Sequence, residues 1–335
     1  MRNAALAGIL AISLIAVLAI FGVQRKDPFP EPLAQRDAVR LAIVGDIMLG
    51  REVGTLMDTN GYDYPLKNIS AFLKNFDISI GNFEGTVRDI YNYRDGLKLK
   101  FSFSPKSLTQ LVDANFSIMS LANNHAFDYD TAGFEETRQK LQSVGISPLG
   151  HPYDVSKGIV TTVELKNRLV SFLGFNATVP AFDTLKAADL VSKTKSENPS
   201  STLIVLIHWG DEYVATHNAT QEKIAHALAT SGANLIIGTH PHVVQDVELY
   251  QDTLIFYSLG NFVFDQNFSA ETKKGLMLGV ELHATSTDVG LFPVNIVRSQ
   301  PTLMNKAERT LFLETVSKKS PAALRDQILK GLLTF

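Results

Sequence analysis

The stretch RLAIVGDIMLGR (residues 40–51) indicates how the folded part of the chain is organised. Its apolar, β-branched first half is typical of a buried strand, and Asp46 and Arg51 follow where that strand is expected to end. In open α/β sheets, ligands gather outside the carboxyl ends of the strands. Asp46 and Arg51 are therefore the first candidates for a functional site.

Further apolar runs along the chain end in polar residues in the same way. They are GNFEG (81–85), LANNHAFD (121–128), IVLIHWGDEY (204–213), LIIGTHPHVVQ (235–245) and IFYSLGNFVFD (255–265). The polar residues that they supply are Asn82, Glu84, Asn123, Asn124, His125, Asp128, His208, Glu212, His240, His242, Ser258 and Asn261. Because these carboxylates, amides and imidazoles should converge on one sheet edge, they predict a metal site.

The composition restricts the chemistry of such a site. The 335 residues include 31 Lys and Arg against 34 Asp and Glu, so the net charge of −3 argues against nucleic acid as a main partner. The chain has no cysteine, which excludes disulfides, thiolate metal sites and a cysteine nucleophile. Oxygen and nitrogen ligands suit Mn, Zn, Fe or Mg, and two such ions about 3.5 to 4 Å apart can clamp an oxyanion.

The pair His240 and His242 is the strongest of these signals. Residues i and i+2 of an extended segment point to the same side, and Pro241 between them stiffens the chain. The alternative is that His-Pro-His forms only a turn. Both interpretations remain open from the sequence.

The other candidates also have structural alternatives. A lone Asp after a strand, such as Asp46, is more often a turn or helix cap, and a single His such as His208 is more often a hydrogen-bonded structural residue. Asn124 beside His125 offers an oxygen ligand and a proton donor, or else an Asx turn. Only the joint pattern favours a metal site over these alternatives.

The alternation of apolar and amphipathic segments predicts an α/β fold. We expect strands at 40–45, 77–81, 116–121, 169–174, 203–208 and 234–238, and helices at 106–114, 131–144 and 219–231. Further strands at 244–250, 254–258, 275–282 and 291–297 predict antiparallel hairpins at the end of the sheet. Residues 305–332 are expected to form two helices that separate near Ser320 and Pro321.

The N-terminus carries a separate signal. Residues 4–23 (AALAGILAISLIAVLAIFGV) contain no charge and are long enough, at about 1.5 Å per residue, to span a bilayer core of about 30 Å. A cleavable signal peptide usually has a shorter apolar region, so we expect an uncleaved anchor within residues 1–26. The flanking charges do not decide its orientation. Residues 27–38, rich in proline and charge, are expected to form a linker.

Six ordered motifs, covering most of residues 41–265, closely resemble the CapA family of capsule and poly-γ-glutamate biosynthesis proteins. They are GDIMLGR (45–51), GNFEGTV (81–87), LANNHAFDYD (121–130), HWGDEY (208–213), GTHPHVVQ (238–245) and YSLGNFVFD (257–265). The resemblance implies a relation to calcineurin-like metallophosphatases, hence a four-layer α/β/β/α sandwich over residues 39–300 with a two-metal site. Residues 301–335 would form a C-terminal helical extension. The resemblance also implies a single-pass cell-membrane protein with an extracytoplasmic domain.

The resemblance also assigns roles to residues. Metal ligands would be Asp46, Asn124, His208, His240 and His242, with His208 and His240 on one ion and His242 on the other, and His125 would be the general acid. Two positions depart from the metallophosphatase pattern, because Met48 and Asn82 replace a histidine and a bridging aspartate. Glu84 is then the nearest carboxylate. The site would hold a single ion, or would hold a second ion only if Glu84 is a ligand.

Arg51 and Glu212 have chemical roles that follow from their residue types. Arg51 suits a carboxylate or phosphate through its bidentate fork, or is instead a surface or helix-dipole arginine. Glu212 is a proton acceptor or a partner of a ligating histidine, or instead caps the loop before the helix at 219–231. His151, His217, His226 and His283 lie outside the motifs and are expected to be structural or solvated.

Two functions compete. The first is a membrane-anchored component of poly-γ-glutamate or capsule synthesis and export, with membrane subunits of a synthetase complex, the lipid bilayer and an anionic polymer as partners. The second is an extracytoplasmic metal-dependent hydrolase acting on a phosphoester, amide or polymer bond, with His125 as the acid. A purely structural surface protein would leave the residues at the strand ends unexplained.

Overall fold

The computed structural model describes residues 38–92, 99–157, 160–180 and 182–335. The expected anchor at 1–26 lies outside the described residues, as does the expected linker at 27–38 except for Ala38. Within the described ranges, no helix has both the length and the apolar character needed to cross a membrane.

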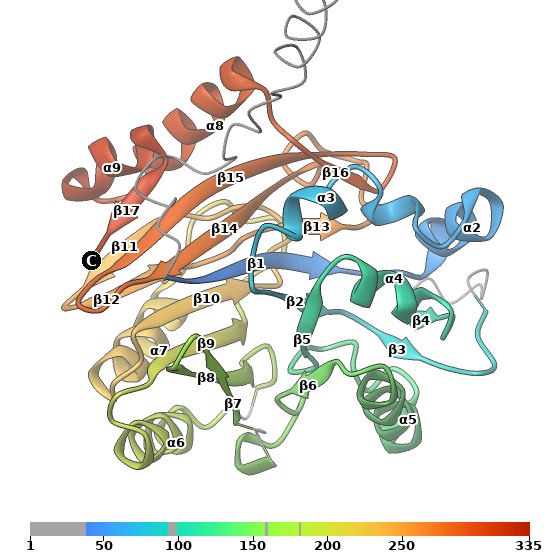
Figure 1. Ribbon diagram of the computed structural model, residues 1–335, viewed down its shortest axis with the longest axis horizontal. Coiled ribbons are helices and arrows are strands. Elements are labelled where there is room, and N and C mark those ends of the chain that lie inside the picture. Colours follow the sequence, from blue (N-terminus) through green and yellow to red (C-terminus); the bar gives the residue numbers. More distant parts are fainter. Residues whose placement is uncertain (1–37, 93–98, 158–159, 181) are drawn as a thin grey trace, which may run out of the picture. The chain divides into compact units, whose positions relative to one another are not determined.

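The larger sheet combines a parallel half with an antiparallel half (Figure 1). Its parallel strands are β1 (Val39–Ile47), β2 (Ile78–Phe83), β5 (Phe116–Ser120), β6 (Ser147–Leu149) and the short β13 (Asn261–Val263), which pairs with β1. Its antiparallel strands are β14 (Lys274–Leu282), β15 (Thr287–Val297), β16 (Gln300–Leu303) and β17 (Leu332–Thr334). The junction between the halves is β1, which pairs with β2 on one side and β14 on the other.

A second sheet has a parallel centre and antiparallel edges. Its order is β11 (Val247–Tyr250), β12 (Thr253–Phe256), β10 (Leu235–Thr239), β9 (Thr202–His208), β8 (Arg168–Asn176) and β7 (Thr161–Leu165). The strands β3 (Thr86–Val87) and β4 (Ser102–Phe103) form a small separate pair. The expected antiparallel hairpins are therefore confirmed, but they belong to two sheets and not to one.

The two sheets share one hydrophobic core. Leu41 and Ile43 of β1 lie in the same buried cluster as Ile204 and Leu206 of β9. The intervening β9 residues, such as Val205, point to the opposite face and pack in a second cluster with α6 (Thr184–Glu197) and α7 (Ala219–Thr230). Because side chains alternate along a strand, β9 buries both faces, and its sequence is a continuous apolar run.

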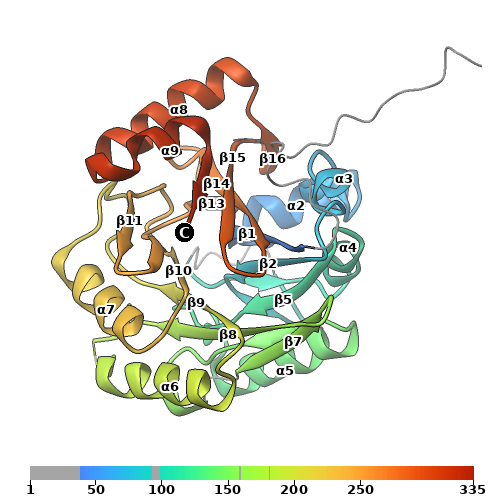
Figure 2. The same cartoon turned by 60° about the vertical axis from the view of Figure 1, so that its left-hand side comes forward.

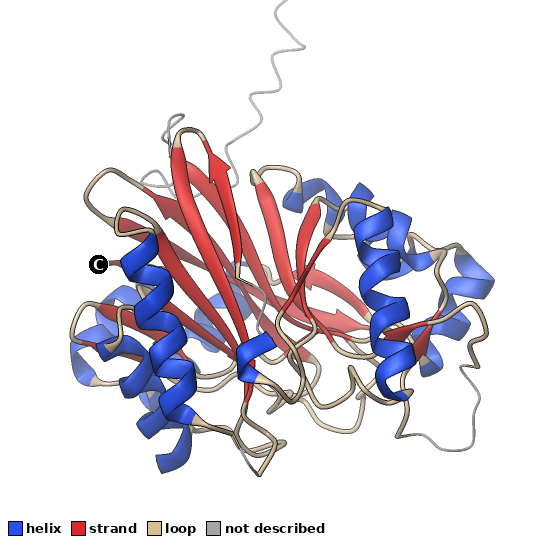
Figure 3. Cartoon of the chain, turned by 90° about the horizontal axis from the view of Figure 1, so that it is seen from below, coloured by secondary structure: helices blue, strands red, loops and turns tan. Residues whose placement is uncertain are grey.

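Helices lie outside the strands, as Figures 2 and 3 show. Those that connect the parallel strands of the larger sheet are α2 (Arg51–Asn60), α3 (Ser70–Leu73), α4 (Ser107–Asp113) and α5 (Asp130–Ser143). Short 3-10 helices are η2 (Tyr64–Leu66), η3 (Val155–Lys157) and η4 (Ala322–Leu324). The C-terminal helices α8 (Lys306–Lys319) and α9 (Arg325–Lys330) run beside β15 and β17.

Most elements expected from the sequence are present close to their expected bounds, and the α/β class is confirmed. The sequence analysis missed α6, whose buried face consists of Ala187, Val191 and Thr194. These small side chains produce only a weak apolar stripe, so the period of the helix is hard to see. Residues 301–335 contain the two expected helices, which separate at Ser320, and end in the unexpected strand β17.

The C-terminal helix α8 provides a matched test of the shared core. Leu313 is fully buried in that core, whereas Leu311 on the same helix is 64% exposed. We expect Leu313→Ala to lower the free energy of unfolding by about 2–5 kcal/mol. Leu311→Ala should change it by less than about 0.5 kcal/mol. Urea unfolding followed by the fluorescence of Trp209 measures both, and equal midpoints would show that α8 does not belong to the core.

Candidate metal centre

The carboxyl ends of strands from both sheets meet at one place. Asp46 lies near the end of β1, His208 ends β9, and His240 directly follows β10. The sequence predicted one sheet edge, whereas the structure brings together the edges of two sheets. The convergence of the candidate side chains is nevertheless present, because both parallel sets of strands end on the same side of the shared core.

The first group of possible ligands is Asp46, Glu84 and His208, whose ligand atoms all lie within 4.8 Å of one another. All three residues are at most 1% exposed. Asn82 lies among them, and its Nδ2 donates to Asp46 Oδ1 at 2.7 Å and to Glu84 Oε2 at 3.3 Å. Asn123 Nδ2 in turn donates to Asn82 Oδ1 at 3.0 Å. The amide of Asn82 therefore holds the two carboxylates together.

The second group is Glu212, His240 and His242, with ligand atoms within the same 4.8 Å limit. The expectation that His240 and His242 lie on an extended segment is wrong, because their φ angles are 97° and 58°. Both residues are in the left-handed region, and the loop turns sharply after β10. Glu212 is exposed and does not cap α7, whose N-cap is Asn218.

The two groups are adjacent. His242 Nδ1 lies 3.2 Å from Asp46 Oδ2, and His242 Nε2 lies 3.7 Å from Glu84 Oε1. The rings of His208 and His240 are 4.7 Å apart between centroids, although the two residues fall into different groups. The resemblance implied that these two histidines share an ion. Their spacing is compatible with that expectation, and His240 also lies close to His242 and Glu212.

Two buried atoms in these groups have no hydrogen-bond partner within the described part of the chain. They are Glu84 Oε1 and His240 Nδ1. A buried carboxylate oxygen and a buried imidazole nitrogen without partners are costly in an otherwise satisfied structure. Because both atoms are good metal ligands, the orphaned atoms fit a divalent cation in this polar cluster.

The protonation of the cluster is set by burial. Burial raises the pKa of Glu84 well above its usual range, and the nearby Asp46 carboxylate adds to this effect. Burial lowers the pKa of His208 well below its usual value, and the neighbouring His240 and His242 act in the same direction. Burial and then His242 lower the pKa of His240 to about 4. His208 and His240 are therefore neutral at physiological pH, as metal ligation requires.

Asn124 and His125 lie at the edge of the first group. Asn124 Oδ1 is 2.9 Å from His208 Nε2. His125 Nδ1 is 2.9 Å from Asp128 Oδ2, and its Nε2 is 4.0 Å from Glu84 Oε1. The ring of His125 also stacks on Phe101 at 3.9 Å between centroids. Asp128 and Phe101 thus fix the His125 ring with its Nε2 toward the cluster.

Arg51 lies at the first position of α2 and forms an ion pair with Asp265. Its Nε donates to Asp265 Oδ2 at 3.1 Å, and its guanidinium lies over the rings of Phe101 and Phe264. The bidentate fork expected from the sequence is therefore directed at a carboxylate of the chain itself. Asp265 ends the YSLGNFVFD motif, but the sequence offered no indication of its partner.

The sequence analysis also missed a chain of polar contacts between the second group and the surface. His242 Nδ1 lies 3.0 Å from Asn261 Oδ1, and Asn261 Nδ2 donates to Gln266 Oε1 at 3.1 Å. Gln266 Nε2 donates to the hydroxyl of Tyr213 at 3.2 Å. The Tyr213 ring lies 6.0 Å from the His242 ring and is 45% exposed. Tyr213 therefore forms part of the solvent-facing rim of the cluster.

The four histidines outside the motifs have structural partners, as expected. His226 lies 3.1 Å from Glu248 and stacks on Tyr250, and His283 lies 3.1 Å from Asp288. His151 Nδ1 accepts hydrogen bonds from the backbone N–H groups of residues 153 and 154. The remaining partners join His217 to Asp246 and Tyr257.

His217 anchors the loop that presents Glu212. Its Nδ1 lies 2.7 Å from Asp246 Oδ2, and its backbone N–H donates to Asp246 Oδ1 at 3.1 Å. The hydrogen bond to Asp246 raises the pKa of His217 above its usual value. Because the folded pKa lies above the unfolded one, the interaction stabilises the protein fully below the unfolded pKa. This stabilisation is lost as the pH rises through the folded pKa.

We therefore expect the difference in unfolding free energy between wild type and His217→Gln to be larger at pH 5.5 than at pH 8.5. The control is Lys223→Gln at an exposed position on α7, and its effect should be the same at both pH values. Urea titrations at several pH values measure both differences. A difference for His217→Gln that does not change with pH would contradict the assigned interaction.

Known proteins are similar to this chain. It is 31% identical over 316 residues to the capsule biosynthesis protein CapA of Bacillus anthracis, covering 87% of this chain and 76% of that protein. It is 32% identical over 321 residues to the PGA biosynthesis protein CapA of Bacillus subtilis (strain 168), covering 89% and 82%. A solved structure of a hypothetical protein from Thermus thermophilus aligns with a TM-score of 0.48 at 18% identity, covering 76% of this chain and 99% of that one. The family described as bacterial capsule synthesis protein PGA_cap matches residues 40–266, so the chain belongs to this family.

Proposed function

We propose that the chain is a membrane-anchored component of poly-γ-glutamate or capsule polymer synthesis or export, and that its polar cluster binds one or two divalent ions. The observation that carries the metal part is the juxtaposition of two ligand groups with two buried atoms that lack partners. The polymer part is supported by family membership and by the names of the two CapA relatives, which refer to capsule and PGA biosynthesis.

The ligands present fit Mn, Zn, Fe or Mg, since the cluster offers only oxygen and nitrogen donors. Asp46, Glu84 and His208 would hold one ion, and Glu212, His240 and His242 the other. A divalent ion there would supply polarisation of a phosphoryl or carboxyl oxygen. The chain itself keeps His208 and His240 neutral through burial. Asn82 holds Glu84 next to Asp46. The second group is open to solvent at Glu212.

Metal content tests this assignment directly. We expect the purified full-length chain, after equilibration with Mn or Zn and removal of excess ion, to retain at least about one ion per chain. The double variant His240→Ala/His242→Ala should lose the ion of the second group and retain at most the ion of the first. His226→Ala, in which a histidine outside the cluster is removed, should retain the metal. Elemental analysis that finds equal metal in all three proteins, or none in wild type, would refute the proposed centre.

The anchor and the location of the domain are part of the same proposal. The uncharged segment 4–23 supports a single-pass anchor in the cell membrane, with residues 39–335 outside the cytoplasm. Such an arrangement would place the cluster beside membrane subunits of a polymer synthetase or export complex. An anionic polymer would then reach the cluster past Arg51, which already carries a carboxylate partner in Asp265.

A metal-dependent hydrolase is the second candidate, and the geometry of His125 favours it. Its Nε2 faces Glu84, while Asp128 and the Phe101 ring fix the orientation of the imidazole. An imidazole held in this way suits proton donation to a leaving group bound at the cluster. The substrate would be an extracytoplasmic phosphoester, amide or polymer bond, and polymer trimming would satisfy both candidate functions.

One cellular experiment separates the two candidates. In Bacillus subtilis whose own CapA is replaced by this chain, the assembly function predicts that deleting residues 4–23 abolishes polymer production while His125→Ala preserves it. The hydrolase function predicts that His125→Ala lowers activity by about 10²–10⁴-fold while metal content stays unchanged. Polymer yield and metal content are measured for both variants. Normal yield without residues 4–23 would contradict the anchored assembly function.

A further inference from the structure

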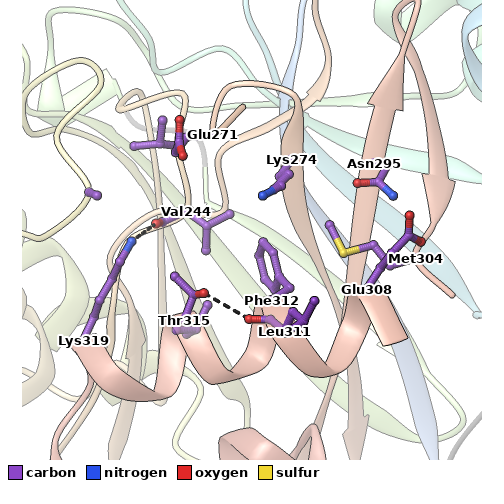
Figure 4. A pocket seen from close by; sticks show the side chains of 13 residues that line it. Val244, Glu271, Lys274, Asn295, Met304, Glu308, Leu311, Phe312, Thr315 and Lys319 are labelled. Atoms are coloured by element: carbon purple, nitrogen blue, oxygen red, sulfur yellow. Dashed lines mark hydrogen bonds between the residues drawn. The ribbon is translucent and has the colours of Figure 1, made fainter. Parts of the chain in front are cut away.

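A cavity of about 360 Å³ lies apart from the polar cluster, against the C-terminal helix α8. Figure 4 shows α8 presenting Leu311, Phe312, Thr315 and Lys319 along one side of this cavity. These positions recur at helical spacing, so they form a single stripe on α8. None of the residues lining the cavity belongs to the two ligand groups.

The interior of the cavity is mainly apolar. Val243, Val244, Met304, Phe312 and Val316 contribute to its lining. Val243 directly follows His242, so the loop of the second ligand group also forms part of the cavity wall. An apolar lining of this size favours a ligand with a hydrocarbon portion.

Two lysines supply the positive charge of the cavity. Lys274 and Lys319 are each only partly exposed, and neither forms an ion pair with any residue that the structure describes. Lys319 Nζ has a carbonyl contact of 3.5 Å with Val244, drawn as a dashed line in Figure 4. Asn295 adds a polar amide to the same lining. Asp246 and Glu271 act on the charge of Lys319 from a distance, but neither lysine has a close ion pair among the described residues. Partly buried ammonium groups of this kind favour an anionic ligand group.

The acidic residues of the cavity lie at its exposed rim. Glu271 and Glu308 are both exposed, and one oxygen of Glu308 accepts the N–H of Asn305 in the capping box of α8. Their charge is therefore better solvated than that of the two lysines. A ligand with several negative charges would meet these carboxylates at the rim, whereas a ligand with a single anionic group needs only the two lysines.

The volume decides the kind of ligand. About 360 Å³ lies within the range of small-molecule pockets, roughly 300–1,000 Å³. We propose that this cavity binds a small amphipathic anion, with one hydrocarbon chain packed along α8 and one carboxylate or phosphate group between Lys274 and Lys319. This site is independent of the proposed metal centre.

Photo-crosslinking of the full-length chain in lipid nanodiscs tests the proposal. The probe is decanoate with a terminal diazirine, and labelled peptides are located by mass spectrometry. We expect labels within 304–319 and 243–244, with competition by decanoate and much weaker competition by decanol. The variant Lys274→Gln/Lys319→Gln should reduce labelling at least about tenfold, which corresponds to about 1.4 kcal/mol. The matched control Lys273→Gln/Lys318→Gln changes two exposed neighbours and should label normally.

A second variant keeps both lysines. Thr315→Trp fills the cavity from an exposed position on α8 and should also reduce labelling, with an unfolding midpoint close to that of wild type.

Nanodiscs with and without phosphatidylglycerol distinguish the source of the anion. If phosphatidylglycerol competes with the probe, the site binds a lipid headgroup. If phosphatidylglycerol does not compete, the site binds a free amphiphile. Full labelling of the double lysine variant, equal competition by decanol, or labels outside the cavity would overturn the proposal.

Discussion

The structure of the site depends on the burial of two carboxylates side by side. Asp46 and Glu84 are both completely buried, and Asn82 donates to each of them through the same nitrogen. Two negative charges without solvent repel each other, and removing each from water costs several kcal/mol. Proton uptake by Glu84 or a bound cation would relieve this cost. The pKa of Glu84 is raised because burial and the neighbouring Asp46 carboxylate both disfavour its charged form.

The positions of these carboxylates require unusually close backbone packing. A Cβ at Gly45 would lie 1.9 Å from the carbonyl oxygen of Gly260, and a Cβ at Gly238 would lie 1.9 Å from that of Tyr257. Gly45 directly precedes Asp46, and Gly238 lies two residues before His240. Both glycines allow the segment 257–260 to pass directly beside the ends of β1 and β10. The backbone N–H of Asp46 donates to Gly260 at 3.1 Å, so this segment positions the site as well as the sheet.

Sequence reasoning identified residues more reliably than their partners. Asp46, Glu84, His208, His240 and His242 were predicted because each lies at or shortly after the end of an apolar run, and this local pattern is visible in one dimension. The structure brings these residues together. The sheet to which each strand belongs depends on long-range pairing. The sequence analysis therefore assigned these residues to one sheet edge, although they come from two sheets. The positive φ angles of the histidine loop were equally hidden, since neither His nor Pro signals a left-handed turn. Asp265 and Tyr213 were missed because their roles depend on contacts with residues distant in sequence.

The two ligand groups differ in a way that bears on chemistry. Asp46, Glu84 and His208 are sealed from solvent, whereas Glu212 in the second group is exposed and Tyr213 stands beside it at the rim. Closed sites suit ions that support structure, and sites with an open position suit ions that meet substrate. Asn82 adds to the closed character of the first group, because its amide donates to both carboxylates. In the proposed centre, a substrate would therefore reach the second group first, and His125 faces the cluster from the Glu84 side.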